Sequence, residues 1–334
     1  MTTLVIQIPA YNEAATIGDV LASLPAQLDG VDRILRLVID DGSSDDSAQV
    51  ALANGADFVL RHRANRGLST AFISGVKFGL ALGADIIVNT DADGQYPGRA
   101  IPTLIAPVLA GEADLVVGDR QLQANAHFSP FKRLLESLGS WFIRQVSRTN
   151  VPDAASGFRA FSRFEALPLQ VYNPYSYTLE TLIQAGRTRS RIASVPIQTQ
   201  ATPRKSRLHK GIHHFIWKQA GAVIRSYVLY QPLRTFLSVG AVLLLAGLAL
   251  LFRFLVFYLT GDGAGHMQSV SVGGTLSIIG IILIIIGFLA DSLRANRQLI
   301  EETLVRQRDS QRVDPDSVIT EFLGNPIFTP SRPR

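Results

Sequence analysis

Apolar and polar residues alternate in two distinct patterns through the N-terminal part of the chain. Short apolar runs that end at turn residues are typical of buried strands, and apolar residues three or four positions apart are typical of helices. The apolar runs are residues 3–8, 34–39, 58–61, 85–90, 114–118 and 192–198, with a further short strand expected after a turn within 153–161. The helical patterns are residues 14–24, 70–82, 101–109, 131–146 and 178–185. Strands that alternate with helices predict an α/β fold with a mostly parallel, doubly wound sheet.

Two much longer apolar segments follow, at residues 236–259 and 272–290. Each is long enough to cross about 30 Å of hydrocarbon at about 1.5 Å per helical residue. Arg253 is the one charged residue in the first segment, and the second segment has none. We therefore expect two transmembrane helices, with a buried hairpin of a soluble domain as the alternative. Arg253 lies near the far end of its segment, where its side chain could extend to the membrane surface.

Basic residues flank these segments unevenly, which predicts their orientation. Lysine and arginine precede the first segment and follow the second, whereas the loop 260–271 between them contains neither. The flanking residues are Lys218, Arg225, Arg234, Arg294, Arg297, Arg306 and Arg308. Because cytoplasmic flanks carry the excess of basic residues, we expect a multi-pass protein of the cell membrane with both termini and the α/β domain in the cytoplasm.

These patterns predict four parts of the chain. Residues 1–210 form the α/β domain, and residues 235–291 carry the two membrane helices. Residues 211–234 mix apolar, aromatic and basic residues, which is typical of an amphipathic helix at a membrane surface, although a helix packed on a core fits nearly as well. Residues 292–334 are expected to form a cytoplasmic tail.

Composition narrows the chemistry that this chain can perform. It has 334 residues, 47% of them hydrophobic, and no cysteine. The absence of cysteine excludes disulfides, thiolate metal sites and a cysteine nucleophile. The net charge of +5 is modest, and we expect no nucleic-acid partner. No G-x-G-x-x-G follows the first strand and no G-x-x-x-x-G-K-[ST] occurs, so dehydrogenase and P-loop functions lose their main support.

The clearest candidate for chemistry is the sequence after the run 85–90. Asp91 and Asp93 follow this predicted strand one residue apart, and Gln95 comes two residues later. Ligands of open α/β sheets bind just beyond the carboxyl ends of strands. Carboxylate and amide oxygens are hard ligands that suit Mg²⁺ or Mn²⁺. The alternative is an Asp-Gly loop in which one aspartate caps the next helix.

Five short motifs occur in series along the α/β part. They are Pro9-Ala10-Tyr11-Asn12-Glu13, Asp40-Asp41-Gly42-Ser43-x-Asp45, Asn65-Arg66-Gly67-Leu68, Asp91-Ala92-Asp93-Gly94-Gln95 and Ser156-Gly157-Phe158-Arg159. In this order they resemble the family 2 glycosyltransferases of the Rossmann-like GT-A fold, and more narrowly the polyprenyl-phosphate glycosyltransferases, which include dolichol-phosphate mannose synthase. The resemblance covers about residues 3–210, with Ser69 standing where many relatives carry glycine. The two C-terminal segments resemble the bacterial branch that glycosylates undecaprenyl phosphate.

The resemblance implies roles for individual residues. It implies a nucleoside pocket, a metal site that holds Mg²⁺ or Mn²⁺, and a site for the acceptor phosphate. The nucleoside residues are Pro9, Tyr11, Glu13 and Asp41, with Asp40 as the next candidate; the metal ligands are Asp91, Asp93 and Gln95; the acceptor-phosphate residues are Arg120, Arg133 and Ser137. Asp91, Asp93, Arg120 and Arg133 would carry the catalysis.

Other residues keep two interpretations each. The basic cluster Arg204, Lys205 and Arg207 either closes over the donor diphosphate or docks on anionic lipid. Arg159 either orients this side of the site or pairs with Asp153. Glu180 either acts near the sugar or is an ordinary acid on a helix surface.

The implied reaction is inverting transfer of one hexose from a UDP- or GDP-sugar to a polyprenyl phosphate at the membrane. A phosphate monoester is already an anion near neutrality, since its second pKa is about 6, so the acceptor needs little help from a general base. Two alternatives remain. One is an enzyme that extends a lipid-linked or polysaccharide glycan, and the other is a non-catalytic membrane module that binds nucleotide sugar or lipid phosphate. A homo-oligomer is possible in each case.

Overall fold

The computed structural model describes residues 1–121, 149, 151–171, 177–200, 232–261, 264–310 and 328–330. The chain divides into two compact units, each of which we describe by itself. The first unit is Met1–Arg207 with Leu304–Arg334, and the second is Leu208–Thr303. The predicted helix 131–146 and the basic cluster at 204–207 lie outside the described residues, as does most of the predicted juxtamembrane helix.

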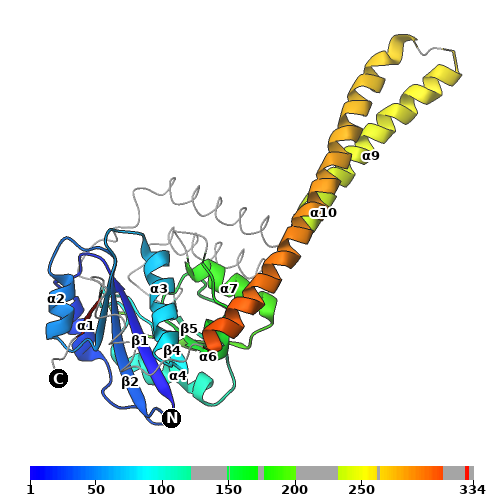
Figure 1. Cartoon of the computed structure of the whole chain (residues 1–334). Helices are drawn as coiled ribbons and strands as arrows, with labels where there is room; N and C mark the ends of the chain where they lie inside the picture. Colours follow the sequence, from blue (N-terminus) through cyan, green and yellow to red (C-terminus); the bar gives the residue numbers. More distant parts are fainter. Residues whose placement is uncertain are drawn as a thin grey trace. The chain divides into compact units, whose positions relative to one another are not determined.

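The first unit is built on one sheet (Figure 1). Its strands are β1 (Thr3–Ala10), β2 (Arg33–Asp40), β3 (Phe58–Arg61), β4 (Ile86–Asn89), β5 (Leu115–Asp119), β6 (Arg159–Ser162), β7 (Ile192–Pro196) and β8 (Phe328–Pro330). The order across the sheet is β7-β5-β6-β4-β1-β2-β3-β8. β6 is antiparallel to both of its neighbours and β8 is antiparallel to β3, while the other pairs are parallel. The prediction of a mostly parallel α/β sheet is confirmed.

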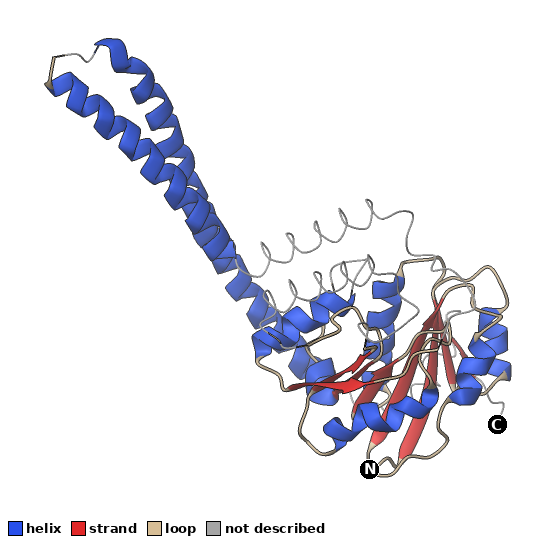
Figure 2. Ribbon diagram, turned by 180° about the vertical axis from the view of Figure 1, so that it is seen from behind, coloured by secondary structure: helices blue, strands red, loops and turns tan. Residues whose placement is uncertain are grey.

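Helices cover both faces of this sheet (Figure 2). They are α1 (Ile17–Ser23), α2 (Ser47–Ala53), α3 (Leu68–Ala81), the 3₁₀ turn Gly98–Ala100, α4 (Ile101–Leu109), α6 (Arg163–Ala166) and α7 (Tyr177–Thr188). Because strand side chains alternate between faces, Leu4, Ile6 and Ile8 of β1 pack in a buried core with residues of α1, α2 and α4. Burial on both faces explains why the strands read as continuous apolar runs.

The opposite face of β1 and β2 meets α3 at very short range. A Cβ added to Gly75 of α3 would lie 2.4 Å from Gln7 Oε1 and 2.7 Å from Ile39 Cδ1. A side chain here would have to displace these two side chains, so the glycine allows the helix backbone to approach the sheet closely.

Strand β6 determines what lies beside β4. Since β6 runs antiparallel between β4 and β5, its first residue, Arg159, is paired with the last residue of β4, Asn89. The segment that precedes β6, Ser156 and Gly157, therefore arrives at the carboxyl end of β4. The motif Ser-Gly-Phe-Arg is brought to the same edge of the sheet as Asp91 by this reversal.

The second unit is an antiparallel pair of long helices, α9 (Pro232–Leu259) and the larger part of α10 (Met267–Ser310), which lie side by side in both views (Figures 1 and 2). Leu233–Leu259 and Met267–Leu293 each contain an 18-residue window with a mean hydropathy of 2.5 and 2.6, and both helices are long and apolar enough to cross a membrane. In these windows 11% and 22% of the residues are buried, which disfavours the alternative of a soluble core hairpin.

Glycines bring the two helices of this hairpin into backbone contact. A Cβ on Gly240 would lie 2.8 Å from the carbonyl oxygen of Gly280, and one on Gly247 would lie 2.6 Å from that of Gly273. These pairs are reciprocal and one heptad apart. Without a hydrophobic driving force in lipid, such close packing is what holds transmembrane helices together.

Candidate active site

The loops after β1 and β2 are joined by hydrogen bonds. Asn12, which has a φ of +54°, donates its backbone N–H to Ser43 Oγ at 2.9 Å. Its side-chain Oδ1 accepts from the backbone N–H of Ser44 at 2.8 Å. The sequence Tyr-Asn-Glu after β1 thus serves partly to fix the Asp-Asp-Gly-Ser loop next to it.

Asp45 extends this junction. It accepts from the backbone N–H of Ala14 at 3.2 Å and from that of Ser47 at 3.0 Å. Although partial burial opposes ionisation, its hydrogen bonds, led by the Ser47 hydroxyl, hold the pKa of Asp45 below its usual value. Helix α2 begins after Asp46, which makes no side-chain cap. Asp45 therefore connects the first residue of α2, Ser47, to the loop after β1.

A third contact connects the loop after β1 to the loop after β4. The Thr16 hydroxyl lies 2.7 Å from the carbonyl oxygen of Ala92 and 3.1 Å from Glu13 Oε2. Glu13 is also close enough to Asp91 to raise the pKa of that carboxyl group. Three strand ends, those of β1, β2 and β4, consequently form one acidic edge.

The acidic pair predicted as metal ligands lies at this edge. The pKa of Asp91 is raised to about 7, first by burial and then by the neighbouring carboxylate of Asp93, with Arg120 acting in the opposite direction. Asp93 Oδ1 accepts from the backbone N–H of Gln95 at 3.0 Å, so the three predicted ligands belong to one tight turn. Two adjacent carboxylates that resist joint ionisation are a site where a bound cation would be favourable.

The donor set fits a hard divalent cation. Asp91 and Asp93 supply carboxylate oxygens and Gln95 an amide oxygen, the ligands that Mg²⁺ and Mn²⁺ prefer. Within the described ranges, no group of three or more His, Cys, Asp or Glu side chains is arranged to hold a metal. Any cation here would therefore take its remaining ligands from the amide, from water or from a substrate, as Mg²⁺ commonly does.

A network of buried hydrogen bonds holds the backbone beside the acidic pair in place. Asn89, the last residue of β4, donates to the carbonyl oxygen of Gly157 at 2.8 Å and contacts the Tyr177 hydroxyl at 3.0 Å. Gln7 of β1 donates in turn to Asn89 Oδ1 at 2.9 Å. A Cβ on Gly157 would lie 3.2 Å from Asp91. The network thus fixes the backbone against which the Asp91 carboxylate rests.

Arg120, predicted for the acceptor phosphate, is held by Asp153. Its Nε and Nη2 donate to the two Asp153 oxygens at 2.7 and 2.8 Å, and its backbone N–H lies 3.2 Å from Oδ2. Asp153 is 1% exposed. This bidentate pairing fixes the direction of the guanidinium group, which remains near enough to Asp91 to oppose the rise in its pKa.

Of the two interpretations of Arg159, the one that pairs it with Asp153 is wrong. Arg159 is fully buried, and its guanidinium group donates to the carbonyl oxygens of Ala154, Ser156 and Thr178 and to the Thr181 hydroxyl. Burial lowers the pKa of Arg159 to about 10, so it stays charged at neutral pH. Its four hydrogen bonds instead join the 154–157 loop, through Ala154 and Ser156, to α7, through Thr178 and Thr181. Sequence alone does not distinguish a carbonyl partner from a carboxylate.

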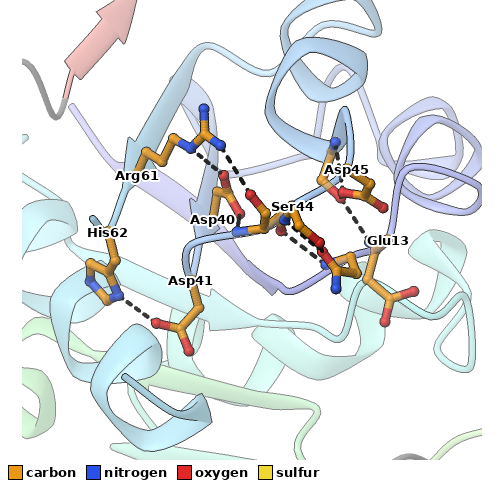
Figure 3. Close-up of polar contacts among 10 residues, drawn as sticks. Glu13, Asp40, Asp41, Ser44, Asp45, Arg61 and His62 are labelled. Atoms are coloured by element: carbon orange, nitrogen blue, oxygen red, sulfur yellow. Dashed lines mark hydrogen bonds and ion pairs between the residues drawn. The ribbon is translucent and has the colours of Figure 1, made fainter. Parts of the chain in front are cut away.

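The predicted nucleoside residues differ in their exposure. Tyr11 is 41% exposed, whereas Pro9 is buried. Asp40 is fully buried and Asp41 is 3% exposed, and both are paired with side chains at the end of β3 (Figure 3). Glu180, one alternative for which was a helix-surface acid, is 3% exposed, so that alternative is wrong.

Several residues at this edge had no counterpart in the sequence interpretation. Arg61, His62, Asn89 and Thr16 belong to no motif that was singled out. Arg61 and His62 stand at the end of one predicted strand, and Asp40 and Asp41 stand at the end of the strand before it. Because parallel register places such strand ends side by side, this pairing could be predicted from the sequence. Of the predicted residues, Arg133, Ser137, Arg204, Lys205 and Arg207 lie outside the described residues.

Comparison with known proteins identifies the family. Residues 5–167 match glycosyl transferase family 2. The chain is 30% identical over 204 residues to the undecaprenyl-phosphate mannosyltransferase of Micrococcus luteus, covering 57% of this chain and 80% of that one. It is 32% identical over 214 residues to the UDP-N-acetylglucosamine–dolichyl-phosphate N-acetylglucosaminyltransferase of Methanococcus voltae, covering 58% and 83%.

A solved structure also resembles the chain. It is the glucosyl-3-phosphoglycerate synthase of Mycobacterium tuberculosis in complex with Mn²⁺, UDP-glucose and phosphoglyceric acid, with 25% identity, a TM-score of 0.53, and coverage of 68% of this chain and 79% of that one. Together with the sheet order and the acidic edge after β4, these similarities establish the family. The chain belongs to glycosyl transferase family 2, in the group that contains the polyprenyl-phosphate sugar synthases.

Proposed function

We propose that this glycosyltransferase moves one hexose, with inversion, from a UDP- or GDP-sugar to a polyprenyl phosphate at the cytoplasmic face of the cell membrane. The observation that carries the proposal is the pair Asp91 and Asp93 at the end of β4, beside Arg120, in a chain with an apolar helical hairpin. Relatives named for transfer to undecaprenyl or dolichyl phosphate support the acceptor class. The product would be a polyprenyl-phosphate sugar for envelope glycans or protein glycosylation.

The chemical problem is to bring two anions together. A divalent cation, Mg²⁺ or Mn²⁺, held by Asp91, Asp93 and Gln95 would supply charge that offsets the leaving nucleoside diphosphate. The Mn²⁺ in the complex of glucosyl-3-phosphoglycerate synthase supports this cofactor class. Tyr11 offers an exposed ring on which a nucleobase could stack.

On the acceptor side, the chain's contribution is a fixed cation. Asp153 orients the Arg120 guanidinium group through two hydrogen bonds, so little reorganisation is needed when a phosphate arrives. Arg133 and Ser137 are proposed to complete that site, and residues 204–207 to cover the diphosphate or contact lipid. The acceptor oxygen is already anionic, so no general base is assigned.

The test is transfer of radiolabel from a panel of UDP- and GDP-hexoses to undecaprenyl phosphate by the purified full chain. We expect label in an organic-extractable, mild-acid-labile lipid. Asp93→Asn should reduce this transfer by more than about 100-fold, since losing even an outer-shell partner of a metal costs about 10- to 100-fold. Asp19→Asn makes the same chemical change at an exposed position of α1 and should leave transfer unaffected.

Each other outcome would contradict the proposal. If Asp93→Asn kept full turnover, the proposed metal site at the end of β4 would be wrong. Label that enters a polysaccharide or a longer glycan would favour an elongating transferase. No product with any donor, together with retained nucleotide binding, would favour a non-catalytic module.

A further inference from the structure

Two neighbouring residues at the end of β3 contact two neighbouring acids at the end of β2. Arg61 Nε lies 3.0 Å from Asp40 Oδ2, and His62 Nδ1 lies 2.7 Å from Asp41 Oδ1 (Figure 3). The strands are parallel with Asp40 opposite Arg61, so the register itself places one β3 side chain beside each acid. Arg61 pairs with the buried carboxylate of Asp40, whereas His62 connects Asp41 to α3.

The Asp41 carboxylate is nearly saturated by this chain. Oδ1 accepts from His62 and from the backbone N–H of Arg66 at 2.9 Å, and Oδ2 accepts from the backbone N–H of Gly67 at 2.8 Å. A carboxylate offers about four acceptor positions, of which these donors take three. A nucleoside that hydrogen-bonds to Asp41 would therefore find one defined position on a carboxylate with no rotational freedom.

His62 fixes the orientation of the Asp41 carboxylate. Its ring is 8% exposed, and its second nitrogen, Nε2, lies 3.1 Å from Ser74 Oγ on α3. Because a carboxylate only accepts, Nδ1 carries the proton that points at Asp41. Asp41 also binds the backbone N–H of Gly67, the residue directly before α3. The contacts close a ring from Asp41 through His62 and Ser74 along α3 and back to Gly67.

We infer that His62 is a positioning residue for the donor nucleotide, acting through the orientation of Asp41. The inference rests on the proposed function, because it takes Asp41 to line the nucleoside pocket. His62 itself needs no contact with the substrate. Without the Nδ1–H of His62, Asp41 Oδ1 would keep a single backbone donor in an almost fully buried site. The Asp41 carboxylate would then rotate away from its binding orientation. The effect should fall on nucleotide affinity and leave Arg120, the acceptor-site residue after β5, untouched.

The test uses two amides that each replace one ring nitrogen. Asparagine places its Nδ2 as many bonds from the backbone as histidine Nδ1, so His62→Asn keeps the donor to Asp41 and loses Ser74. His62→Gln reaches the position of Nε2 and loses Asp41. Binding of UDP and of GDP, each with MnCl₂, is measured by calorimetry on the full chain in detergent, and thermal unfolding of each variant is recorded in parallel.

We expect His62→Gln to weaken nucleotide binding and to raise the donor KM roughly tenfold, the factor that corresponds to about 1.4 kcal/mol, with the acceptor KM unchanged. His62→Asn and Ser74→Ala should stay within about threefold of the unaltered chain, because both keep the Asp41 contact. A purely structural role would instead move the unfolding temperature of the two amide variants equally and leave nucleotide affinity alone.

The outcomes separate the two proposals. If the unaltered chain binds UDP or GDP but His62→Gln binds it equally well, the inference is wrong and the proposed function stands. If His62→Asn loses as much affinity as His62→Gln, the contact with Asp41 is not what matters, and the inference is again wrong. If the unaltered chain binds neither nucleotide with Mn²⁺, both the function and the inference fall.

Discussion

Glu165 gives the most direct test of the electrostatics of this fold. It lies at the third position of α6 and is 3% exposed, with its carboxylate accepting a hydrogen bond from the Ser190 hydroxyl. Burial raises the pKa of Glu165 to about 7, with Asp114 adding to the rise and Ser190 opposing it. Its backbone N–H is capped by Ser162, but the carboxylate is turned inward, away from the usual return contact of a capping box.

The sign of the consequence follows from proton linkage. The pKa of a glutamate in the unfolded chain is about 4.3 to 4.5, so between that value and pH 7 the folded state binds more protons. Stability therefore falls as pH rises through this window. A difference of about 2.5 pH units, at 1.36 kcal/mol each, makes the loss about 3 kcal/mol as an upper estimate. Glu165→Gln keeps the shape and the Ser190 contact and removes the ionisation.

We expect Glu165→Gln to match the unaltered chain at pH 4 and to exceed its unfolding temperature by about 6–12 °C at pH 8, because the loss is about 3 kcal/mol and 1 kcal/mol corresponds to about 2–4 °C in a domain of this size. The assay is thermal unfolding of the full chain in detergent at fixed scan rate across this pH range. Glu112→Gln is the matched control, since Glu112 is exposed. Parallel pH curves for Glu165→Gln and the unaltered chain would refute the reasoning.

Three further perturbations test other parts of the molecule. Asn89→Leu should destabilise the fold by about 2–4 kcal/mol, because buried partners lose their hydrogen bonds. It should also lower kcat by a larger factor than it changes either KM, since Gly157 rests against Asp91. An unchanged kcat in a folded variant would contradict this. Gly247→Leu should lower the melting temperature of the helical hairpin, because even its Cβ would clash with Ser277 Oγ and lie 2.6 Å from the carbonyl oxygen of Gly273, whereas a Cβ at Gly274 meets nothing within 4 Å and Gly274→Leu should be tolerated. Equal melting of both variants would rule out the glycine contacts. Excess EDTA should abolish transfer, with Mn²⁺ or Mg²⁺ restoring it; turnover that survives chelation would exclude a metal-dependent reaction.

The elements of the fold followed closely from the hydrophobic pattern. β3 and α4 have the predicted bounds, and β1, β2, β4, β5 and β7 differ by one or two residues at their ends, whereas β8 has no predicted counterpart. The strands with both faces buried, such as β1 and β4, read as apolar runs. The direction of β6 was not predictable. A four-residue strand carries no information about its partners, and the antiparallel pairing depends on tertiary contacts such as Asn89 with Gly157.

The location of the site was easier to predict from the sequence than the partners of its side chains. The motifs pointed to the edge of the sheet where β1, β2 and β4 end, and the described residues place Glu13, Asp91 and Arg120 there within electrostatic range of one another. The pairs Asp153–Arg120 and His62–Asp41 were not predicted, because their members lie 33 and 21 residues apart along the chain. Such pairs are fixed by strand order and register, which one sequence constrains only weakly.

One ambiguity in the sequence is resolved by charge. Two acidic loops follow strands of this sheet, Asp40–Asp46 and Asp91–Asp93, and by residue type either could hold a cation. In the folded chain Arg61 and His62 neutralise or bind the first pair, and backbone N–H groups take its remaining oxygens. Among the described residues, Asp91 and Asp93 are compensated only by the more distant Arg120 and by the backbone N–H of Gln95 on Asp93, and burial together with Asp93 raises the pKa of Asp91. A divalent cation therefore gains more at the end of β4 than at the end of β2, and Mn²⁺ affinity should depend on Asp93 while remaining insensitive to His62→Gln.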